Sequence, residues 1–449
     1  MQFDVTGIIP LYKEEFLPCR IPEISLNRKR KKIEKISSES RHHFKHKAIL
    51  RRTHFGWSLE SGGMLLLASL KSRVVELGQE GLLHSSLSDQ DILFLEVLNA
   101  YDLLSNEMPN EQLTIYDVSE KYLALYDGEE FGWFNYSPSK ISIDLTSKCN
   151  AHCIHCSRDA NKVAAEIDRE ALNSVLQQGS KLGVNSLSLM GGEPTIYPDF
   201  IAVARYASEL GYQNIATSTN GIALTELLVQ EMAEIFTQVQ VSIHGSSNSM
   251  HERVTQVTHS FKSATAAVEK LASQNVSVVI SCTVFSAKRD EIFNMVKLAD
   301  FLGAKSIRFL GLFEQGRACD MPTLSKADRL IVRDWIEEAK EQYEGVLTIH
   351  AGGFPAAKSP KKYACNYGCP AGREILNISA EGQIGPCANI DWSCGSIYTD
   401  KLGDVWHSED MRQIRKKMKC DCAYTAICAG PCLANDGFLG REYDVNDYF

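Results

Sequence analysis

The sequence lacks a long apolar run. No stretch of about 18 consecutive uncharged apolar residues occurs in the 449 residues, so no transmembrane helix is expected. The first residues, MQFDVTGIIPLYKEEF, lack the basic start and the long apolar core of a secretory signal peptide. Tandem repeats and low-complexity tracts are also missing. The sequence therefore predicts a cytoplasmic protein with no membrane partner.

Cysteine, by contrast, is abundant. The chain has fourteen cysteines, and a reducing cytoplasm does not favour their pairing as disulfides. Metal binding or redox chemistry explains them better. The length suggests roughly two to four domains, and 44% hydrophobic with 23% charged residues is typical of a globular chain.

Basic residues are outnumbered by acidic ones except in one segment. The formal net charge is −9, yet residues 28–52 carry eleven Lys/Arg against two acidic residues, which leaves 36 basic and 54 acidic residues elsewhere. A basic arm on an acidic body is able to bind nucleic acid or an acidic peptide. A solvated segment without a partner is the simpler interpretation, and nucleic acid is not expected as a partner.

Three regions differ in pattern. Residues 1–138 contain no metal-binding motif, residues 139–345 alternate between apolar strands and amphipathic helices, and residues 346–449 are rich in Cys, Gly and Pro. The strand candidates of the middle region are 140–145, 185–190, 214–219, 238–243, 276–285 and 305–312. Repeated βα units with buried strands indicate a parallel sheet. Because six units are too few for an eight-fold barrel, we predict an α/β fold with a partial (βα)6 TIM-like barrel.

Helical periodicity supports this division. In the middle region it is clearest at 168–183, 261–275 and 289–304. In the N-terminal region, residues 54–81 are expected to form a strand, a turn, a second strand and a helix with Leu70, Val74 and Leu77 on one face. A second amphipathic stretch follows at 89–104. These elements suggest a small α+β domain resembling a winged helix; a plain helical extension is the alternative.

Three cysteines stand close together just after the first predicted barrel strand. Cys149, Cys153 and Cys156 are spaced C-x3-C-x2-C, at the end of the strand where such barrels place their active sites. A structural zinc ion usually takes four protein ligands, and His152 or His155 could be the fourth. An iron–sulfur cluster is the other candidate, with three thiolates and one open iron. The spacing favours the cluster.

The next predicted strand ends in a second motif. Gly191, Gly192, Glu193 and Pro194 follow NSLSLM directly. Two glycines allow a ligand to approach the backbone closely, and the carboxylate can accept hydrogen bonds from an ammonium group. A turn with an incidental acid is the alternative for this motif alone. Together with C-x3-C-x2-C one strand earlier, the ligand-binding interpretation is strongly favoured.

These paired motifs resemble those of the radical S-adenosylmethionine (SAM) superfamily, over roughly residues 139 to 320. The resemblance implies that Cys149, Cys153 and Cys156 hold a [4Fe–4S] cluster whose open iron binds the SAM amino and carboxylate groups. It also implies that the reduced cluster cleaves SAM to a 5′-deoxyadenosyl radical, which abstracts hydrogen from substrate. The implied SAM-binding residues are Gly191, Gly192, Glu193, Pro194, Ser218, Thr219, Asn220 and Ser242. At the position of His244 the family often has Asp. We therefore expect His244 to be a hydrogen-bonded loop residue, and a contact with SAM is the alternative.

Eight further cysteines lie near the C-terminus: Cys365, Cys369, Cys387, Cys394, Cys420, Cys422, Cys428 and Cys432. They resemble the SPASM extension of radical SAM enzymes, which typically binds two auxiliary [4Fe–4S] clusters. A suggested division is Cys365, Cys369, Cys387 and Cys432 for one cluster, with Cys420, Cys422, Cys428 and Cys394 for the other. The chain departs from the family in its C-x1-C at Cys420 and in having no cysteine after Cys432, so the fourth ligand of the second cluster is open. Buried thiols are predicted for Cys19 and Cys282, and no role for Cys319.

The resemblance implies a function as well. SPASM-type enzymes mostly modify peptides, so the expected substrate is a ribosomally made precursor peptide that is cross-linked, epimerised or oxidised. The N-terminal domain is then a candidate for binding the peptide's leader at a sheet edge. A low-potential donor such as flavodoxin or ferredoxin is an expected partner. Synthesis of a small-molecule cofactor, such as haem or a quinone, and a non-catalytic iron–sulfur or zinc protein are the alternatives.

Overall fold

The computed structural model describes residues 41–44, 48–53, 56–61, 64–68, 82–83, 104–105, 114–116, 120–126, 134–354, 369–390 and 392–417. They fall into two compact units, one up to residue 137 with residues 415–417, the other formed by 138–354 and 369–414. No helix within these stretches is long and apolar enough to cross a lipid bilayer.

The first unit contains two small sheets. One has the order β4-β3-β2-β7, from β2 (Ala48–Thr53), β3 (Gly56–Ser61), β4 (Met64–Ala68) and β7 (Thr114–Tyr116). The other joins β1 (Arg41–Phe44) to β5 (Leu82–Leu83) and β6 (Leu104–Ser105). The short helix α4 (Glu120–Leu123) follows. The antiparallel β3–β4 hairpin confirms the predicted strand–turn–strand. The helices expected around Leu70 and at 89–104 lie outside the described residues, except for Leu104.

The second unit is built on a parallel sheet. Its central strands are β8 (Lys140–Asp144), β9 (Ser186–Met190), β10 (Asn214–Thr219), β11 (Gln238–Ser242), β12 (Ser277–Thr283) and β13 (Ser306–Leu310). They lie in sequence order, each parallel to the next. All six predicted strands, and with them the α/β barrel-type fold, are therefore confirmed.

The same sheet continues beyond the predicted six strands. β14 (Thr348–Gly352) lies parallel to β13, and β15 (Ile375–Ile378) lies parallel to β8. An antiparallel extension, β16 (Gln383–Gly385) and β17 (Gly395–Ser396), follows β15. All four belong to the range 346–449 that the sequence pattern set apart from the barrel. The pairing of β15 with β8 joins residues more than 230 positions apart, which local periodicity does not reveal.

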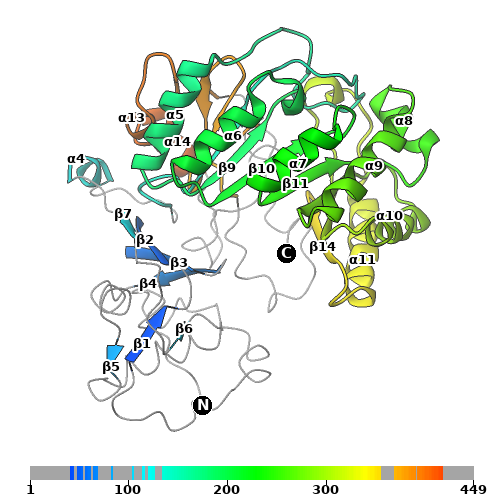
Figure 1. Ribbon diagram of the computed structural model, residues 1–449, viewed down its shortest axis with the longest axis horizontal. Helices are drawn as coiled ribbons and strands as arrows, with labels where there is room; N and C mark the ends of the chain where they lie inside the picture. The colour runs from blue at the N-terminus through cyan, green and yellow to red at the C-terminus, as the bar shows by residue number, and fades with distance from the viewer. Residues whose placement is uncertain are drawn as a thin grey trace. The chain divides into compact units, whose positions relative to one another are not determined.

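Helices connect the parallel strands. They are α5 (Arg169–Lys181), α6 (Phe200–Glu209), α7 (Glu226–Ile235), α8 (Asn248–Thr255), α9 (Ser260–Ser273), α10 (Arg289–Phe301) and α11 (Lys326–Gln342). Short helices α13 (Leu402–Trp406) and α14 (Glu409–Lys417) come later in the chain. The predicted helices are α5, α9 and α10. Figure 1 shows α5, α6 and α7 side by side along the sheet.

Helix α5 illustrates how the sequence specifies these elements. The Asp168 carboxylate accepts hydrogen bonds from the backbone N–H groups of Glu170 and Ala171, which satisfies donors that the first helical turn leaves free. Leu172, Val175 and Leu176 are buried against the sheet, where each stabilises the fold by about 1.5–3 kcal/mol. Because β8 to β13 are parallel, their carboxyl ends meet at one edge of the sheet, where folds of this kind place their sites.

Candidate functional site

The carboxyl ends of the parallel strands surround a cavity of about 340 Å³. It is lined by ten of the residues that the sequence motifs singled out: Cys149, Cys153, Cys156, Gly191, Gly192, Glu193, Ser218, Thr219, Asn220 and Ser242. Pro194 is not among the lining residues; it is buried at the first position of the short helix η4 (Pro194–Ile196). Tertiary structure thus gathers four separate strand ends, those of β8, β9, β10 and β11, around one space, which we call the site cavity.

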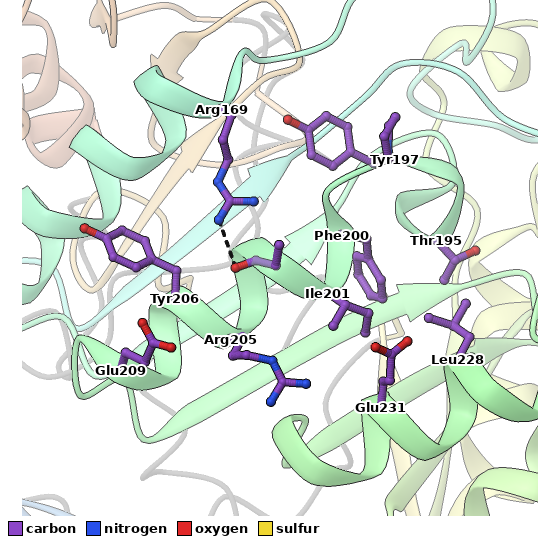
Figure 2. A pocket seen from close by; sticks show the side chains of 12 residues that line it. Arg169, Thr195, Tyr197, Phe200, Ile201, Arg205, Tyr206, Glu209, Leu228 and Glu231 are labelled. Carbon is purple, nitrogen blue, oxygen red and sulfur yellow. Dashed lines mark hydrogen bonds between the residues drawn. The ribbon is translucent and has the colours of Figure 1, made fainter.

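A larger cavity, of about 640 Å³, lies on the helical side of the sheet among α5, α6 and α7 (Figure 2). Arg169, Tyr206 and Glu231 are among its lining residues. The Arg169 guanidinium donates a hydrogen bond to the Ala202 carbonyl at 3.0 Å, drawn as a dashed line in Figure 2. None of the motif residues listed above lines this larger cavity. The volume of a cavity therefore does not identify the candidate functional site.

The loop that carries the three cysteines is held by hydrogen bonds from distant segments. The Asn161 side chain accepts from the Cys149 N–H at 2.8 Å and donates to the Cys149 carbonyl at 2.9 Å. The backbone N–H of Ile154 donates to Val254 in α8 at 2.9 Å. The Arg317 guanidinium donates through Nε to the Cys153 carbonyl at 2.8 Å. The thiol positions are therefore determined by tertiary contacts as well as by their spacing.

The thiols themselves are only partly exposed. Burial raises the pKa of Cys149 to about 11 and the pKa of Cys153 to about 12. Because a thiol binds iron or zinc as the thiolate, loading the site must release these protons. Among the described residues, no three His, Cys, Asp or Glu side chains are placed to hold a single metal ion. Three thiols spread around a cavity suit a larger group, such as an iron–sulfur cube with three cysteine ligands.

The two glycines of the second motif make room for the backbone of the cysteine loop. Gly191 has φ +142°, and a Cβ there would collide with the Thr146 carbonyl oxygen. A Cβ on Gly192 would collide with the Lys148 carbonyl oxygen and lie 2.7 Å from that of Ser147. Both glycines also line the site cavity, and the start of the cysteine loop occupies the space that their side chains would fill.

Gly192→Ala is expected to displace the cysteine loop, since backbone carbonyls have little freedom to move away from a new methyl group. We expect the free energy of unfolding to fall by about 1–3 kcal/mol and the reconstituted protein to hold less iron. Gly211→Ala is the control for iron content: φ is +89° there, so an alanine strains the backbone, but nothing lies within 4 Å of the added carbon. Chemical denaturation measures the stability of both variants, and an equal loss of iron in the two would contradict the prediction.

Glu193 joins two strand ends. Its carboxylate is 1% exposed and accepts four hydrogen bonds. Oε1 accepts from the Thr195 N–H and hydroxyl at 3.2 and 2.5 Å and from the Thr219 hydroxyl at 2.6 Å, and Oε2 accepts from the Asn220 N–H at 2.8 Å. Burial raises the pKa of Glu193, and these donors oppose the shift. Oε2, with a single protein donor, is the oxygen with capacity for a ligand donor.

The other polar strand-end residues are partly engaged with the protein. The Asn220 amide donates to Asn150 Oδ1 at 2.6 Å and weakly to the Cys149 sulfur at 3.8 Å, which links the third strand end to the first. The Ser218 hydroxyl accepts from Gln240 at 3.0 Å. Ser242 lines the same cavity from β11. Asn220 is therefore both a lining residue and a support for the cysteine loop.

Three histidines meet beside the cysteine loop. The rings of His155 and His244 lie edge to face with centroids 4.4 Å apart, and those of His244 and His251 are stacked at 6.0 Å. His244 is hydrogen-bonded as predicted, since its Nδ1 accepts from the Thr283 N–H at 3.2 Å, and it also lines the site cavity. Burial lowers the pKa of His155 to about 4 and that of His244 well below its usual value. These imidazoles are neutral at pH 7.

The protonation of His251 is expected to make the free energy of unfolding depend on pH. Burial lowers its pKa to about 4 from a usual value near 6.5, and its Nδ1 accepts from the His244 N–H at 3.1 Å. Between these pH values the unfolded chain binds more protons, so stability is present above pH 6.5 and is lost as the pH falls towards 4. We expect His251 to account for a loss of about 2 kcal/mol between pH 7 and 5.

Denaturant unfolding of the metal-free protein across this pH range is the measurement. In His251→Asn, which keeps an acceptor in place of Nδ1, the pH dependence should be flatter by that amount. Exposed His259→Asn is the control and should keep the wild-type slope. Parallel slopes for wild type and His251→Asn would refute this assignment.

Several lining residues were not predicted. Ser281 and Thr283 end β12, and Leu310 ends β13. Since both strands were predicted, the rule that sites form at carboxyl ends could have found these residues. No predicted strand ends at the remaining residues, Arg317, Ala388 and Asn389, which line the cavity only because of tertiary contacts.

Three of the C-terminal cysteines fall within the described residues. Burial is the main cause that raises the pKa of Cys387, and the nearby Cys369 raises it further. Cys394 is half-buried against the core, and its N–H donates to the Ile384 carbonyl at 2.7 Å. Cys19, Cys365, Cys420, Cys422, Cys428 and Cys432 lie outside the described residues. Cys282 is buried, as predicted, and Cys319 is exposed and does not line the site cavity.

Comparison with known families agrees with this arrangement. Residues 143–310 match the radical SAM superfamily, and residues 369–432 match SPASM, an iron–sulfur cluster-binding domain. The first match runs from the end of β8 to the end of β13 and includes both sequence motifs. The second begins at Cys369 and ends at Cys432.

Individual relatives were found by sequence and by structure. The chain is 30% identical over 284 residues to a PqqA peptide cyclase of Methylobacterium sp. (strain 4-46), covering 60% of this chain and 73% of the relative. It is 26% identical over 318 residues to the AdoMet-dependent heme synthase of Methanosarcina barkeri, covering 66% and 91%. Streptococcus suis SuiB, solved with S-adenosylmethionine and with its precursor peptide SuiA, gives TM-scores of 0.68 and 0.67 at 17% identity, over 91% of this chain and 98% of SuiB. The chain belongs to the radical SAM superfamily and carries a C-terminal SPASM domain.

Proposed function

We propose that this chain is a SPASM-type radical SAM enzyme that modifies a ribosomally made precursor peptide. In this proposal Cys149, Cys153 and Cys156 hold the cluster that binds SAM. Gly191 to Pro194 lie along the SAM amino group, and Ser218, Thr219, Asn220 and Ser242 contact the rest of the molecule. Cys365, Cys369, Cys387, Cys394, Cys420, Cys422, Cys428 and Cys432 hold the auxiliary clusters.

One observation carries the proposal: the site cavity collects three thiols and the polar ends of β9, β10 and β11 in one place. When bound, the cluster and SAM supply a radical able to abstract hydrogen from an unactivated carbon. The chain's own residues then bind the ligand and exclude water. Glu193 offers Oε2 to a cationic group, while Leu310, Leu312 and Phe313 line the cavity with apolar surface that excludes water.

A peptide substrate is supported by the relatives. Among those reported above, one is named a peptide cyclase and SuiB was solved with a precursor peptide. We further propose that residues 1–138 bind the leader of the peptide, that residues 139–345 form the catalytic barrel, and that residues 346–449 hold the auxiliary clusters. A low-potential flavodoxin or ferredoxin in the cytoplasm would supply the electron for this oxidoreductase.

Synthesis of a small-molecule cofactor is the second candidate. The heme synthase relative, matched over 91% of its length, supports it. The two candidates differ in substrate and share the site, so they predict the same SAM cleavage and different products.

The deciding experiment uses the full chain, reconstituted with iron and sulfide without oxygen. It is reduced in the presence of SAM and the peptide product of a neighbouring small gene, and the peptide mass is measured. A loss of two hydrogens would indicate a cross-link or an oxidation, and deuterium uptake from solvent without other mass change would indicate epimerisation. SAM cleavage with an unchanged peptide and a converted tetrapyrrole would favour the second candidate. A protein that does not cleave SAM under any of these conditions would contradict both.

A further inference from the structure

Arg158 closes the loop that carries the first three cysteines. It follows Cys156 by two positions, and its guanidinium reaches back to Asp144, the last residue of β8. Nη1 lies 3.0 Å from Oδ2 of Asp144, and Nη2 donates to Oδ1 at 3.0 Å. Two parallel contacts of this kind hold both side chains in one orientation. The ion pair therefore ties the end of the cysteine loop to its beginning.

The same guanidinium contacts the segment after Cys387. Nη1 of Arg158 donates to the Ala388 carbonyl at 2.7 Å, across 230 positions of sequence. Cys387 itself holds its sulfur 3.4 Å from the donating N–H of Asn389. One side chain thus connects the loop of Cys149, Cys153 and Cys156 with the residue next to an auxiliary cysteine.

Arg158 also stands between two cavities. It lines the site cavity and a second cavity of about 620 Å³, which Cys387 lines as well. Asp144 is 5% exposed; burial raises the pKa of its carboxyl group, and Arg158 opposes this shift. Its positive charge therefore lies beside both cavities.

We propose that Arg158 is a positioning residue that couples the 149–156 loop to the Cys387 segment, and that the Arg158–Asp144 pair sets the reduction potential of the iron–sulfur groups beside it. The proposal rests on the proposed function, in which these cysteines hold clusters. Reduction adds one electron, taken from the external low-potential donor, to a cluster without breaking a bond. A nearby fixed positive charge stabilises that added negative charge, and a nearby carboxylate opposes it.

Because the two side chains carry opposite charges, neutralising each of them should shift the reduction potential in opposite directions. Arg158→Gln removes the positive charge and should shift the one-electron equilibrium of a cluster at least tenfold towards the oxidised form, a potential lower by 59 mV or more. Asp144→Asn should shift the potential upwards. Arg158→Lys keeps the charge and should stay near wild type, and Arg169→Gln on α5 is the control with no shift. The potentials are measured in the reconstituted full chain by titration followed with electron paramagnetic resonance.

Equal potentials in Arg158→Gln and wild type, or shifts of the same sign for Arg158→Gln and Asp144→Asn, would overturn the electrostatic role. The coupling role has a readout that needs no cluster, namely hydrogen exchange of residues 387–390 in the metal-free protein. Exchange should be faster in both Arg158 variants, since neither Gln nor Lys can make all three contacts, and unchanged exchange would overturn it. If the wild type cleaves SAM and only these differences are missing, the proposed function stands and this inference alone is wrong.

Discussion

Cys153→Ala is expected to abolish the reductive cleavage of SAM, leaving 5′-deoxyadenosine at the level of a reaction without enzyme. The thiol is one of three that line the site cavity, and an iron–sulfur cube with only two protein ligands has two open irons. The cluster is then lost or no longer presents a single open iron to SAM. The measurement is 5′-deoxyadenosine formed by the reduced, reconstituted protein. Iron content should fall by about a third if two auxiliary clusters remain.

Cys319→Ser is the matched control for this prediction. Cys319 is exposed, lies outside the site cavity, and its thiol donates to the Asp320 carboxylate at 3.3 Å. The variant should therefore cleave SAM like the wild type. Cleavage that persists in Cys153→Ala would remove the basis for assigning the 149–156 loop to a cluster.

Glu193→Ala is expected to have the second largest effect, on both stability and SAM binding. The change leaves the buried Thr219 hydroxyl and the half-buried Asn220 N–H without their acceptor. Unsatisfied buried donors cost about 1–3 kcal/mol each, so we expect the free energy of unfolding to fall by about 3 kcal/mol. SAM binding should weaken as well, because the carboxylate is the group available to a ligand ammonium.

Glu193→Gln separates these two effects. It preserves the size of the side chain, but its amide NH2 must face one of the four protein donors, and the negative charge is lost. We expect an intermediate stability with SAM binding as weak as in Glu193→Ala, measured by equilibrium dialysis of labelled SAM against the reconstituted protein. Wild-type SAM binding in Glu193→Gln would show that Glu193 serves only to join β9 to β10.

Local pattern was enough for much of the fold. The alternation of strands and amphipathic helices identified β8 to β13, because such strands carry buried apolar side chains in alternation, as Ile141 and Ile143 do in β8 and Ile307 and Phe309 in β13. It did not reveal that β14 and β15 extend the same sheet at its two edges. β14 comes shortly after helix α11, whereas β15 follows a Cys- and Gly-containing stretch, and for both strands the choice of a pairing partner depends on the whole sheet.

The sequence by itself determined which motifs this protein carries: thiols at C-x3-C-x2-C and an acid after two glycines lie in short stretches that can be read without coordinates, and together they resemble the motifs of radical SAM enzymes. Only the tertiary structure decided how they are supported. It showed that Gly191 and Gly192 make room for the cysteine loop, that Glu193 is a buried joint between two strands, and that Arg158 reaches Ala388. Such contacts join residues that are dozens to hundreds of positions apart, and chain folding alone brings them together.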